Sequence, residues 1–309
     1  MSDAPEPDAD PAPPPALDTS VSDSLASEPL AADPLAAGLY VCATPIGNLG
    51  DASRRLLSVL ARADGVLCED TRVTAKLLAA YGIRADLSPY HDHNGARVRP
   101  GILEALRGGA ALALVSDAGT PLVSDPGYKL VAEARAAGVA VHAVPGPSAP
   151  IAALMVSGAP TDRFSFHGFV PNKAKARGDA FAALAARNET LMFFDTAPRL
   201  AATLESLARV MPDRTVSVAR ELTKRFEEVV TGAPGALAER YAEAPPRGEI
   251  VLIVHPPEGG AGAPADVDGL LRAALAEHRV KDAAALVAEA TGLPRRDLYA
   301  RALALKAEG

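Results

Sequence analysis

The strongest constraint on the fold is an alternation of short, wholly apolar segments with segments of helical periodicity. Such runs lie at residues 39–43, 65–68 and 111–115, and a similar run at 139–144 contains one polar residue, His142. Strands without polar residues are buried on both faces, as in a parallel sheet that helices cover on both sides. We therefore predict an α/β domain at residues 38–158, with helices at 54–63, 71–81, 128–137 and 149–156.

A second unit follows the Gly-Ala-Pro-Thr-Asp break at residues 158–162. Strand-like runs occur at 164–170, 190–194, 215–219, 226–230 and 249–254, with helical runs between them. We predict a second α/β domain at residues 159–256 with a five-stranded sheet, its pairing parallel or mixed.

The C-terminal part has a different composition. Residues 257–265 are rich in Gly, Ala and Pro and are predicted to be a linker. Residues 266–309 hold three short helical periods, the last two joined at Gly292-Leu293-Pro294. This small helical domain resembles a helix-turn-helix, with a packing appendage without nucleic-acid contact as the alternative.

The N-terminal segment, residues 1–37, holds eight Asp and Glu residues and no Lys, Arg or His. We predict that it is disordered, because it has little apolar surface to bury. Without these eight acids the chain has 31 basic and 30 acidic residues, a net charge of 31 − 30 = +1. Bulk charge therefore does not indicate nucleic-acid binding, although a local basic patch stays open.

Several features favour a cytoplasmic protein. No apolar run approaches the roughly 20 residues that span a bilayer. The N-terminal segment has neither the basic start nor the apolar stretch of a secretory signal. Cys42 and Cys68 lie in strand-like runs, and we expect buried free thiols rather than a disulfide.

Four loops directly follow predicted strands, where open parallel sheets bind their ligands. Loop 44–51 has two glycines but neither a GxGxxG nor a GK(S/T) pattern, so nucleotide-binding sites of those types are not supported. Loop 116–127 combines two acids, three hydroxyl residues, two glycines and two prolines, which favours a functional role. The other two loops are residues 69–72 and 145–149, in which Ser148 is placed to cap a helix.

Polar residues in two segments have competing interpretations. Glu69, Asp70 and Arg72 leave a strand end together, and Asp70 is either a functional acid or a helix N-cap paired with Arg72. His91 and His93 flank an Asp, but no second pair of ligands lies at metal-binding spacing. We predict no metal site and favour substrate contact, with a polar surface loop as the alternative.

These loops, in this order, resemble the tetrapyrrole methylase superfamily, the class III S-adenosylmethionine-dependent methyltransferases. They are most similar to its branch that methylates the ribose 2′-hydroxyl of a cytidine in the decoding region of 16S ribosomal RNA. The resemblance covers residues 39–255 and extends to the C-terminal helices. One segment departs from the family pattern: Asp195 and Pro198 stand where the family usually has Glu and His.

The resemblance implies two α/β domains with S-adenosyl-L-methionine in the cleft between them. A carboxylate that accepts the hydroxyl proton would assist the transfer. The implied cofactor-binding residues are Pro45, Gly119, Thr120, Val123, Ser124, Ser148, Ala149, Phe194, Ala219 and Ile250. The candidate catalytic residues are Glu69, Asp70, Arg72 and Asp117. The candidate RNA-binding residues are His91, His93, Asn94, Lys173, Arg199 and Arg220, with Lys175 and Arg177 beside Lys173.

The expected partners are 16S ribosomal RNA in the small subunit and a second copy of the chain, with no membrane. Two alternatives stay open at this point. One is a C-methyltransferase of a porphyrin-like precursor, and the other is a non-catalytic RNA-binding protein of ribosome assembly. The first would bind a coloured tetrapyrrole, and the second would have no need of the special loops.

Overall fold

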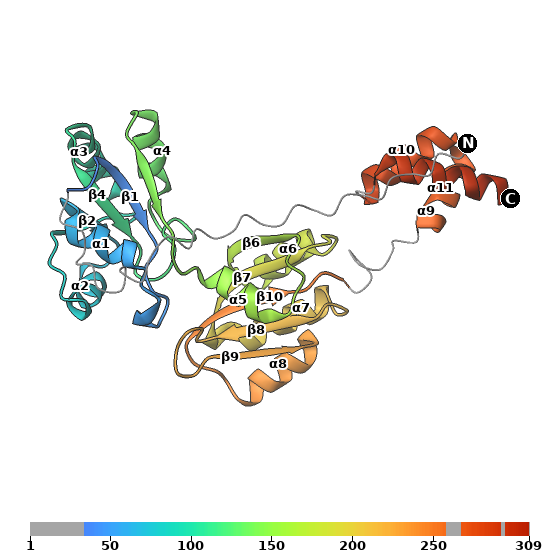
Figure 1. Cartoon of the computed structure of the whole chain (residues 1–309). Helices are drawn as coiled ribbons and strands as arrows, with labels where there is room; N and C mark the ends of the chain where they lie inside the picture. The colour runs from blue at the N-terminus through green and yellow to red at the C-terminus, as the bar shows by residue number, and fades with distance from the viewer. Residues whose placement is uncertain (1–33, 258–266, 292–293, 309) are drawn as a thin grey trace, which may run out of the picture.

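A computed structural model describes residues 34–257, 267–291 and 294–308 of the chain. These residues form two α/β units and a unit of three helices (Figure 1). Most of the predicted N-terminal tail, nearly all of the predicted linker and part of the Gly292-Leu293-Pro294 turn lie outside the described residues.

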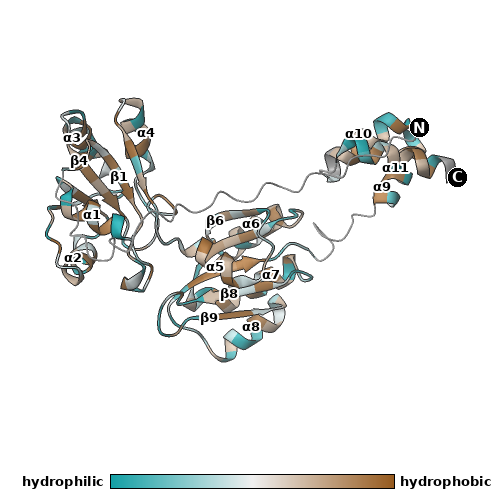
Figure 2. Cartoon of the chain, in the orientation of Figure 1, coloured by the Kyte–Doolittle hydropathy of each residue, from teal (hydrophilic) through white to brown (hydrophobic). Residues whose placement is uncertain are grey.

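The first unit is built on a five-stranded parallel sheet of order β3-β2-β4-β1-β5. Its apolar strands are drawn in brown in Figure 2. The predicted parallel sheet is therefore confirmed. The strands are β1 (Gly38–Cys42), β2 (Gly65–Cys68), β3 (Leu87–Pro89), β4 (Ala111–Val115) and β5 (Val141–Val144).

Helices cover both faces of this sheet because the strands present apolar side chains on each face. On one face, Leu56 and Leu60 of α1 (Arg54–Arg62) pack with Leu78 of α2 (Thr71–Ala80). On the other face, Leu103 of α3 (Gly95–Arg107) packs with Leu130 of α4 (Tyr128–Ala136).

Two elements of the first unit were not predicted. Strand β3 has only three residues and contains a proline, and α3 has Pro100 in its interior. Both lack the pattern that identifies their type of element.

The short 3-10 helix η2 (Leu49–Asp51) precedes α1. The N-cap of α1 is Ser53, whose hydroxyl accepts the Leu56 N–H at 3.0 Å.

The second unit has a mixed sheet of order β6-β7-β10-β8-β9, in which β6 and β7 are parallel and the other neighbours antiparallel. Its strands are β6 (Phe164–Phe169), β7 (Thr190–Thr196), β8 (Val216–Arg220), β9 (Glu228–Gly232) and β10 (Glu249–Val254). One face packs on α6 (Ala174–Leu184), α7 (Leu200–Val210) and α8 (Pro234–Glu243). The 3-10 helix η3 (Ala197–Arg199) leads into α7.

Helix α5 (Ala149–Ser157) covers the opposite face of this second sheet. Its residues Ala153 and Leu154 join an apolar cluster with Met192, Val251 and Ile253. A domain boundary at residue 158 would assign α5 to the first unit, but its packing places it with the second. We therefore propose that the boundary lies just before α5.

The C-terminal unit consists of α9 (Val267–Glu277), α10 (Val280–Thr291) and α11 (Arg295–Glu308). Leu271, Val287 and Leu298 form its own small core. Among the described residues, no helix has the length and apolar character needed to cross a bilayer. Cys42 and Cys68 are buried free thiols, and burial raises the pKa of Cys42 to about 12.

Candidate functional site

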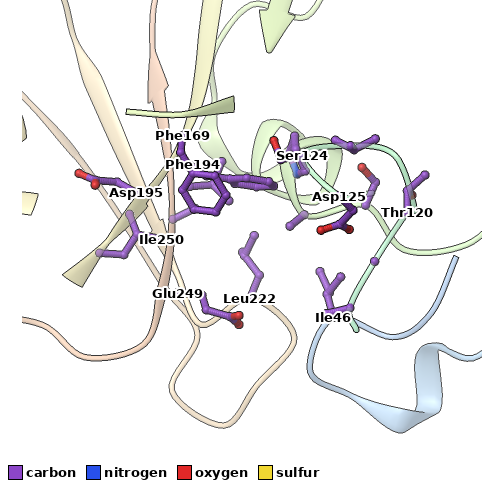
Figure 3. Close-up of a pocket in the computed structure, with 18 of the residues that line it drawn as sticks. Ile46, Thr120, Ser124, Asp125, Phe169, Phe194, Asp195, Leu222, Glu249 and Ile250 are labelled. Atoms are coloured by element: carbon purple, nitrogen blue, oxygen red, sulfur yellow. The ribbon is translucent and has the colours of Figure 1, made fainter. Parts of the chain in front are cut away.

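A cavity of about 410 Å³ lies where the loops of the first unit meet the second sheet (Figure 3). The first unit contributes Ile46 and most of residues 117–125, which follow β1 and β4. The second unit contributes the N-terminus of α5 and residues at the ends of β6, β7, β8 and β10. The cavity therefore lies at the carboxyl end of the parallel sheet, where ligands of such sheets bind.

The loops of the first unit are fastened to one another around this cavity. Thr44 and Gly119 exchange backbone hydrogen bonds of 2.9 and 3.1 Å, which joins the loops after β1 and β4. The Thr120 hydroxyl donates to the Pro147 carbonyl at 2.9 Å, which adds the loop after β5. Gly119 has a φ of 79° at this junction, a conformation that glycine adopts without strain.

The same region of the first unit also touches the second unit. A Cβ atom on Gly47 would lie 2.4 Å from Cγ of Lys224, so only a glycine allows this approach. Lys224 is held in turn by Glu221 at 3.0 Å and Glu249 at 2.5 Å. These contacts hold the loop after β1 against the loop between β8 and β9.

The loop after β4 carries backbone strain at two positions. Leu122 and Ser124 have φ values of 71° and 66°, which side chains other than glycine rarely adopt. Strain of this kind costs about 1–3 kcal/mol per residue and is concentrated at ligand sites. The strained backbone places Val123, Ser124 and Asp125 on the cavity wall.

Aromatic and aliphatic side chains form the opposite wall. The Phe194 ring lies 5.2 Å from the ring of Phe169 and 4.8 Å from that of Phe166. Leu222 and Ile250 complete this apolar surface (Figure 3). Flat apolar walls facing polar backbone groups suit a planar heterocycle with a polar substituent.

Nine of the ten predicted cofactor residues line this cavity, although their contact with a cofactor stays a prediction. Pro45 is the exception, and its neighbour Ile46 lines the cavity in its place. The nine are Gly119, Thr120, Val123, Ser124, Ser148, Ala149, Phe194, Ala219 and Ile250. Ser148 occupies the N-cap position of α5 without a side-chain capping hydrogen bond.

The catalytic candidates at residues 69–72 lie outside the cavity lining. Asp70 is the N-cap of α2 and accepts the Arg72 N–H at 2.8 Å, and its carboxylate pairs with the Arg72 guanidinium at 2.5 Å. These hydrogen bonds lower the pKa of Asp70 to about 2. The geometry thus matches the N-cap interpretation that the sequence left open.

Glu69, in the same loop, and Asp117, in the loop after β4, lie close enough for their charges to interact. Burial raises the pKa of Glu69, and the charges of Asp117 and Asp92 raise it further. Asp117 does line the cavity, and its Oδ1 accepts the backbone N–H of Asp70 at 3.0 Å.

The residues expected to bind RNA are dispersed, and several are engaged within the protein. Asn94 closes its own loop: Oδ1 accepts the His91 N–H at 2.9 Å and Nδ2 donates to the Pro89 carbonyl at 2.8 Å. Arg199 pairs with Asp195 at 2.7 Å, and Arg220 with Glu228 at 3.2 Å.

The other RNA-binding candidates have different surroundings. His93 and Lys173 are exposed, while His91 is partly buried with its ring 6.0 Å from that of His93. Lys175 pairs with Asp179, and Arg177 is buried. In the part of the chain that the structure describes, no cluster of three or more His, Cys, Asp and Glu side chains is arranged to hold a metal ion.

Several residues of the cavity were not predicted as site residues. Phe169, Leu222 and Glu249 lie in or beside strands of the second unit, where no sequence pattern marks a ligand-facing residue. Asp125 belongs to loop 116–127, whose composition did indicate function. Its burial and the strained backbone before it distinguish it from Asp117, and the sequence shows neither.

Two family models match the chain. The model described as "Tetrapyrrole (Corrin/Porphyrin) Methylases" matches residues 38–238, and the "RsmI C-terminal HTH domain" matches residues 261–306.

Similar proteins bear one name, "Ribosomal RNA small subunit methyltransferase I". The protein of Erythrobacter litoralis is 50% identical over 269 residues, covering 87% of this chain and 95% of its own length. That of Mesorhizobium japonicum is 50% identical, covering 87% and 92%. That of Escherichia coli O157:H7 is 45% identical, covering 86% and 94%.

Solved structures with the same fold are more distant in sequence. Diphthine synthase has a TM-score of 0.55 at 16% identity, covering 70% of this chain and 89% of its own. Uroporphyrin-III-C-methyltransferase from Thermus thermophilus has a TM-score of 0.51 at 21% identity, covering 71% and 94%. At these identities the likeness establishes the fold alone.

Proposed function

The chain belongs to the tetrapyrrole methylase family, and we propose that it methylates the ribose 2′-hydroxyl of a cytidine in the decoding region of 16S ribosomal RNA. It is an S-adenosyl-L-methionine-dependent methyltransferase. The observation that carries the RNA substrate is 45–50% identity, across 86–87% of the chain, to proteins named as small-subunit ribosomal RNA methyltransferases.

The cavity fits S-adenosyl-L-methionine in size and chemistry. Its volume of about 410 Å³ falls within the about 300–1,000 Å³ of small-ligand sites. Phe194, Leu222 and Ile250 offer an apolar surface for the adenine ring, and the loop of Gly119 and Thr120 offers backbone groups for hydrogen bonds. When bound, the cofactor supplies an electrophilic methyl group with a good leaving group.

The protein's own contribution is to position the hydroxyl and exclude water. A transfer between two held reactants gains chiefly from orientation, so the strained loop after β4 and the fastened loop after β1 have a direct role. We propose that Asp117 and Glu69 contribute negative charge beside the reacting hydroxyl. We assign Asp70 and Arg72 to the support of that loop, because they are paired with each other.

RNA binding is proposed for three regions. The C-terminal helices match a helix-turn-helix domain of this enzyme group. We therefore propose that α9 to α11 bind a part of the RNA that lies outside the cavity. His91 and His93 lie next to the loop of Glu69, and Lys173 begins α6 with its side chain exposed. Arg199 and Arg220 are weaker candidates, because each has a carboxylate partner.

We further propose a cytoplasmic homodimer that acts on the small ribosomal subunit. Helix α5 exposes Ile151, Met155 and Val156 on the side opposite its packed face, with Met155 78% exposed. A second copy of the chain would bury this apolar surface. Light scattering of the purified protein at several concentrations tests the dimer.

The two alternatives have less support. Tetrapyrrole methyltransferases share the fold, but at 21% identity or less, which does not transfer their substrate. A non-catalytic assembly protein would have no use for a cavity of this size lined by a strained loop, which this chain has.

One experiment tests the proposal directly. The protein is incubated with radiolabelled S-adenosyl-L-methionine and small subunits from cells lacking the enzyme, and the labelled nucleotide and atom are mapped. We expect label on a ribose 2′-oxygen of a decoding-region cytidine. Label on a base would reject the 2′-hydroxyl assignment, and the absence of label on RNA would reject the RNA substrate.

A further inference from the structure

Four carboxylates line the cavity, and they differ in their partners. Asp195 is paired with Arg199 at 2.7 Å, and Glu249 with Lys224 at 2.5 Å. Asp117 accepts the backbone N–H of Asp70 at 3.0 Å. Neither Asp117 nor Asp125 forms an ion pair with a cationic side chain among the described residues, and of the two only Asp125 is partly buried.

Ser116, a polar neighbour of Asp125, also has other hydrogen-bond partners. Ser116 lies close enough for its hydroxyl to interact with the Asp125 carboxylate. Yet that hydroxyl also donates toward the carbonyls of Ala118 and Gly119, at 3.2 and 3.1 Å. A hydroxyl has a single proton, so Asp125 lacks a donor committed to it alone.

The backbone holds Asp125 in place while its carboxylate faces the cavity. Ser124 before it has a φ of 66°, and Pro126 follows it. Gly127 is packed so tightly that a Cβ atom there would lie 2.9 Å from Cδ2 of Leu114. In Figure 3 the Asp125 carboxylate points from this loop into the cavity, on the side facing Leu222 and the aromatic wall.

The surroundings of Asp125 favour uptake of a proton. Burial raises the pKa of its carboxyl group to about 6, and the charges of Glu69 and, to a smaller extent, Asp117 add to the rise. A carboxylate with a pKa near the working pH is an effective general base. Asp70, by contrast, has a pKa of about 2 and accepts protons poorly.

We propose that Asp125 is the catalytic base, taking the proton from the ribose 2′-hydroxyl as the new oxygen–carbon bond forms. This inference rests on the proposed function. The hydroxyl oxygen bonds to the methyl carbon, the carbon–sulfur bond breaks, and its electron pair stays on sulfur. The hydroxyl proton moves to Asp125, so the products are the methyl ether, neutral S-adenosylhomocysteine and protonated Asp125, which returns its proton to water.

The test compares Asp125→Asn with Asp117→Asn, which removes the same charge from the same cavity. We expect Asp125→Asn to lower kcat on small subunits by at least about 100-fold, in the range of general-base catalysis. Its affinity for S-adenosylhomocysteine, measured by calorimetry, stays within about twofold of wild type. Asp117→Asn lowers kcat by less than Asp125→Asn does.

Two further readouts separate a base from a structural residue. The kcat/KM of the wild type rises with pH through about 6, and this rise is absent in Asp125→Asn and kept, with a shifted midpoint, in Asp125→Glu. Carboxyl NMR of the cofactor-free wild type shows an aspartate titrating near that pH, which is missing from the spectrum of Asp125→Asn.

Each outcome decides the matter. An Asp125→Asn variant with wild-type kcat, or one that keeps the rise of kcat/KM near pH 6, overturns the assignment, as does a larger loss of kcat in Asp117→Asn. If Asp125→Asn does not fold, the wild-type titration and the Asp125→Glu profile still decide. Mapping of the wild-type product is read separately: a methyl group on a base overturns the proposed function itself.

Discussion

Replacement of Arg199 by Met is expected to destabilise the second unit rather than to weaken RNA binding alone. Nη2 of Arg199 donates to Oδ1 of Asp195 at 2.7 Å, and the Asp195 side chain is 0% exposed. The Asp195 carboxylate has one other donor, the Thr196 N–H at 2.8 Å, while its Oδ2 atom is buried without a partner. Without Arg199 a buried charge would lose its counterion.

The size of this effect follows from the burial of the pair. Breaking a buried ion pair lowers the free energy of unfolding by about 3–5 kcal/mol. Because the Arg199 side chain is 24% exposed, we expect the lower end of this range, about 3 kcal/mol. For a folded body of about 220 residues, at about 2–4 °C per kcal/mol, Tm falls by about 6–12 °C. Asp195→Asn in the same chain removes the unpaired charge and should recover most of this loss.

The assay is thermal and urea unfolding of wild type, both single variants and the double variant, with binding to small subunits measured in parallel. The cycle gives the coupling between the two side chains directly. An Arg199→Met variant with wild-type Tm and a clear loss of subunit affinity would refute the structural role and favour the RNA-binding role expected from the sequence.

Three other predictions follow from the site. S-adenosylhomocysteine at 100 times its Kd should raise the free energy of unfolding by about 2.7 kcal/mol, and Phe194→Ala should reduce the thermal shift at the same concentration; equal shifts would place the ligand elsewhere. Asp70→Ala should lower the free energy of unfolding in urea through the lost N-cap of α2, whereas Asp70→Asn should lower it less, and equal losses would contradict the capping role. Asp125→Asn should be more stable than wild type at pH 8, because the folded state raises the pKa of Asp125 from 3.8 to about 6 and so disfavours its charged form. That advantage should shrink as the pH falls below about 6 and vanish only well below the unfolded-state pKa of 3.8, where the carboxyl group of wild type is protonated in both states; an advantage independent of pH would contradict it.

The sequence predicted those parts of the fold whose side chains are buried on a regular face. The strands at residues 39–43 and 111–115 are apolar throughout, and the structure pairs them in parallel at the centre of the first sheet. Helix α3 was not predicted because Pro100 and Gly101 interrupt its apolar pattern, although Leu103 and Leu106 of the same helix are buried in the core. Periodicity is informative only where it is not broken by such residues.

Helix α5 shows a different limit of prediction from sequence. Its residues are nearly all apolar, so no polar face marks the side that points away from the core. Both sheets offer apolar surface, and only the fold shows that Ala153 and Leu154 pack on the second one.

The sequence likewise predicted only a part of the candidate site. Glycines, prolines and hydroxyl residues after strands marked the cavity-lining loops, since these residues serve close backbone approach and fixed turns. Both acids of loop 116–127 line the cavity, and the partly buried position of Asp125 follows positive φ angles at Leu122 and Ser124, residues that rarely adopt them. The sequence could therefore name the loop but not select Asp125 over Asp117.

Pro198 stands where the sequence resemblance implies a His, and this restricts the chemistry further. Pro198 lies in η3, just before α7, where a residue without an N–H is tolerated because the first N–H groups of a helix have no partner within it. Asp195 and Arg199 still form their ion pair across this turn, so the segment keeps its structural contact without an imidazole. Pro198 has no group that exchanges a proton, so proton transfer in this chain must use other residues. Asp125, which lines the cavity and forms no ion pair among the described residues, meets that requirement.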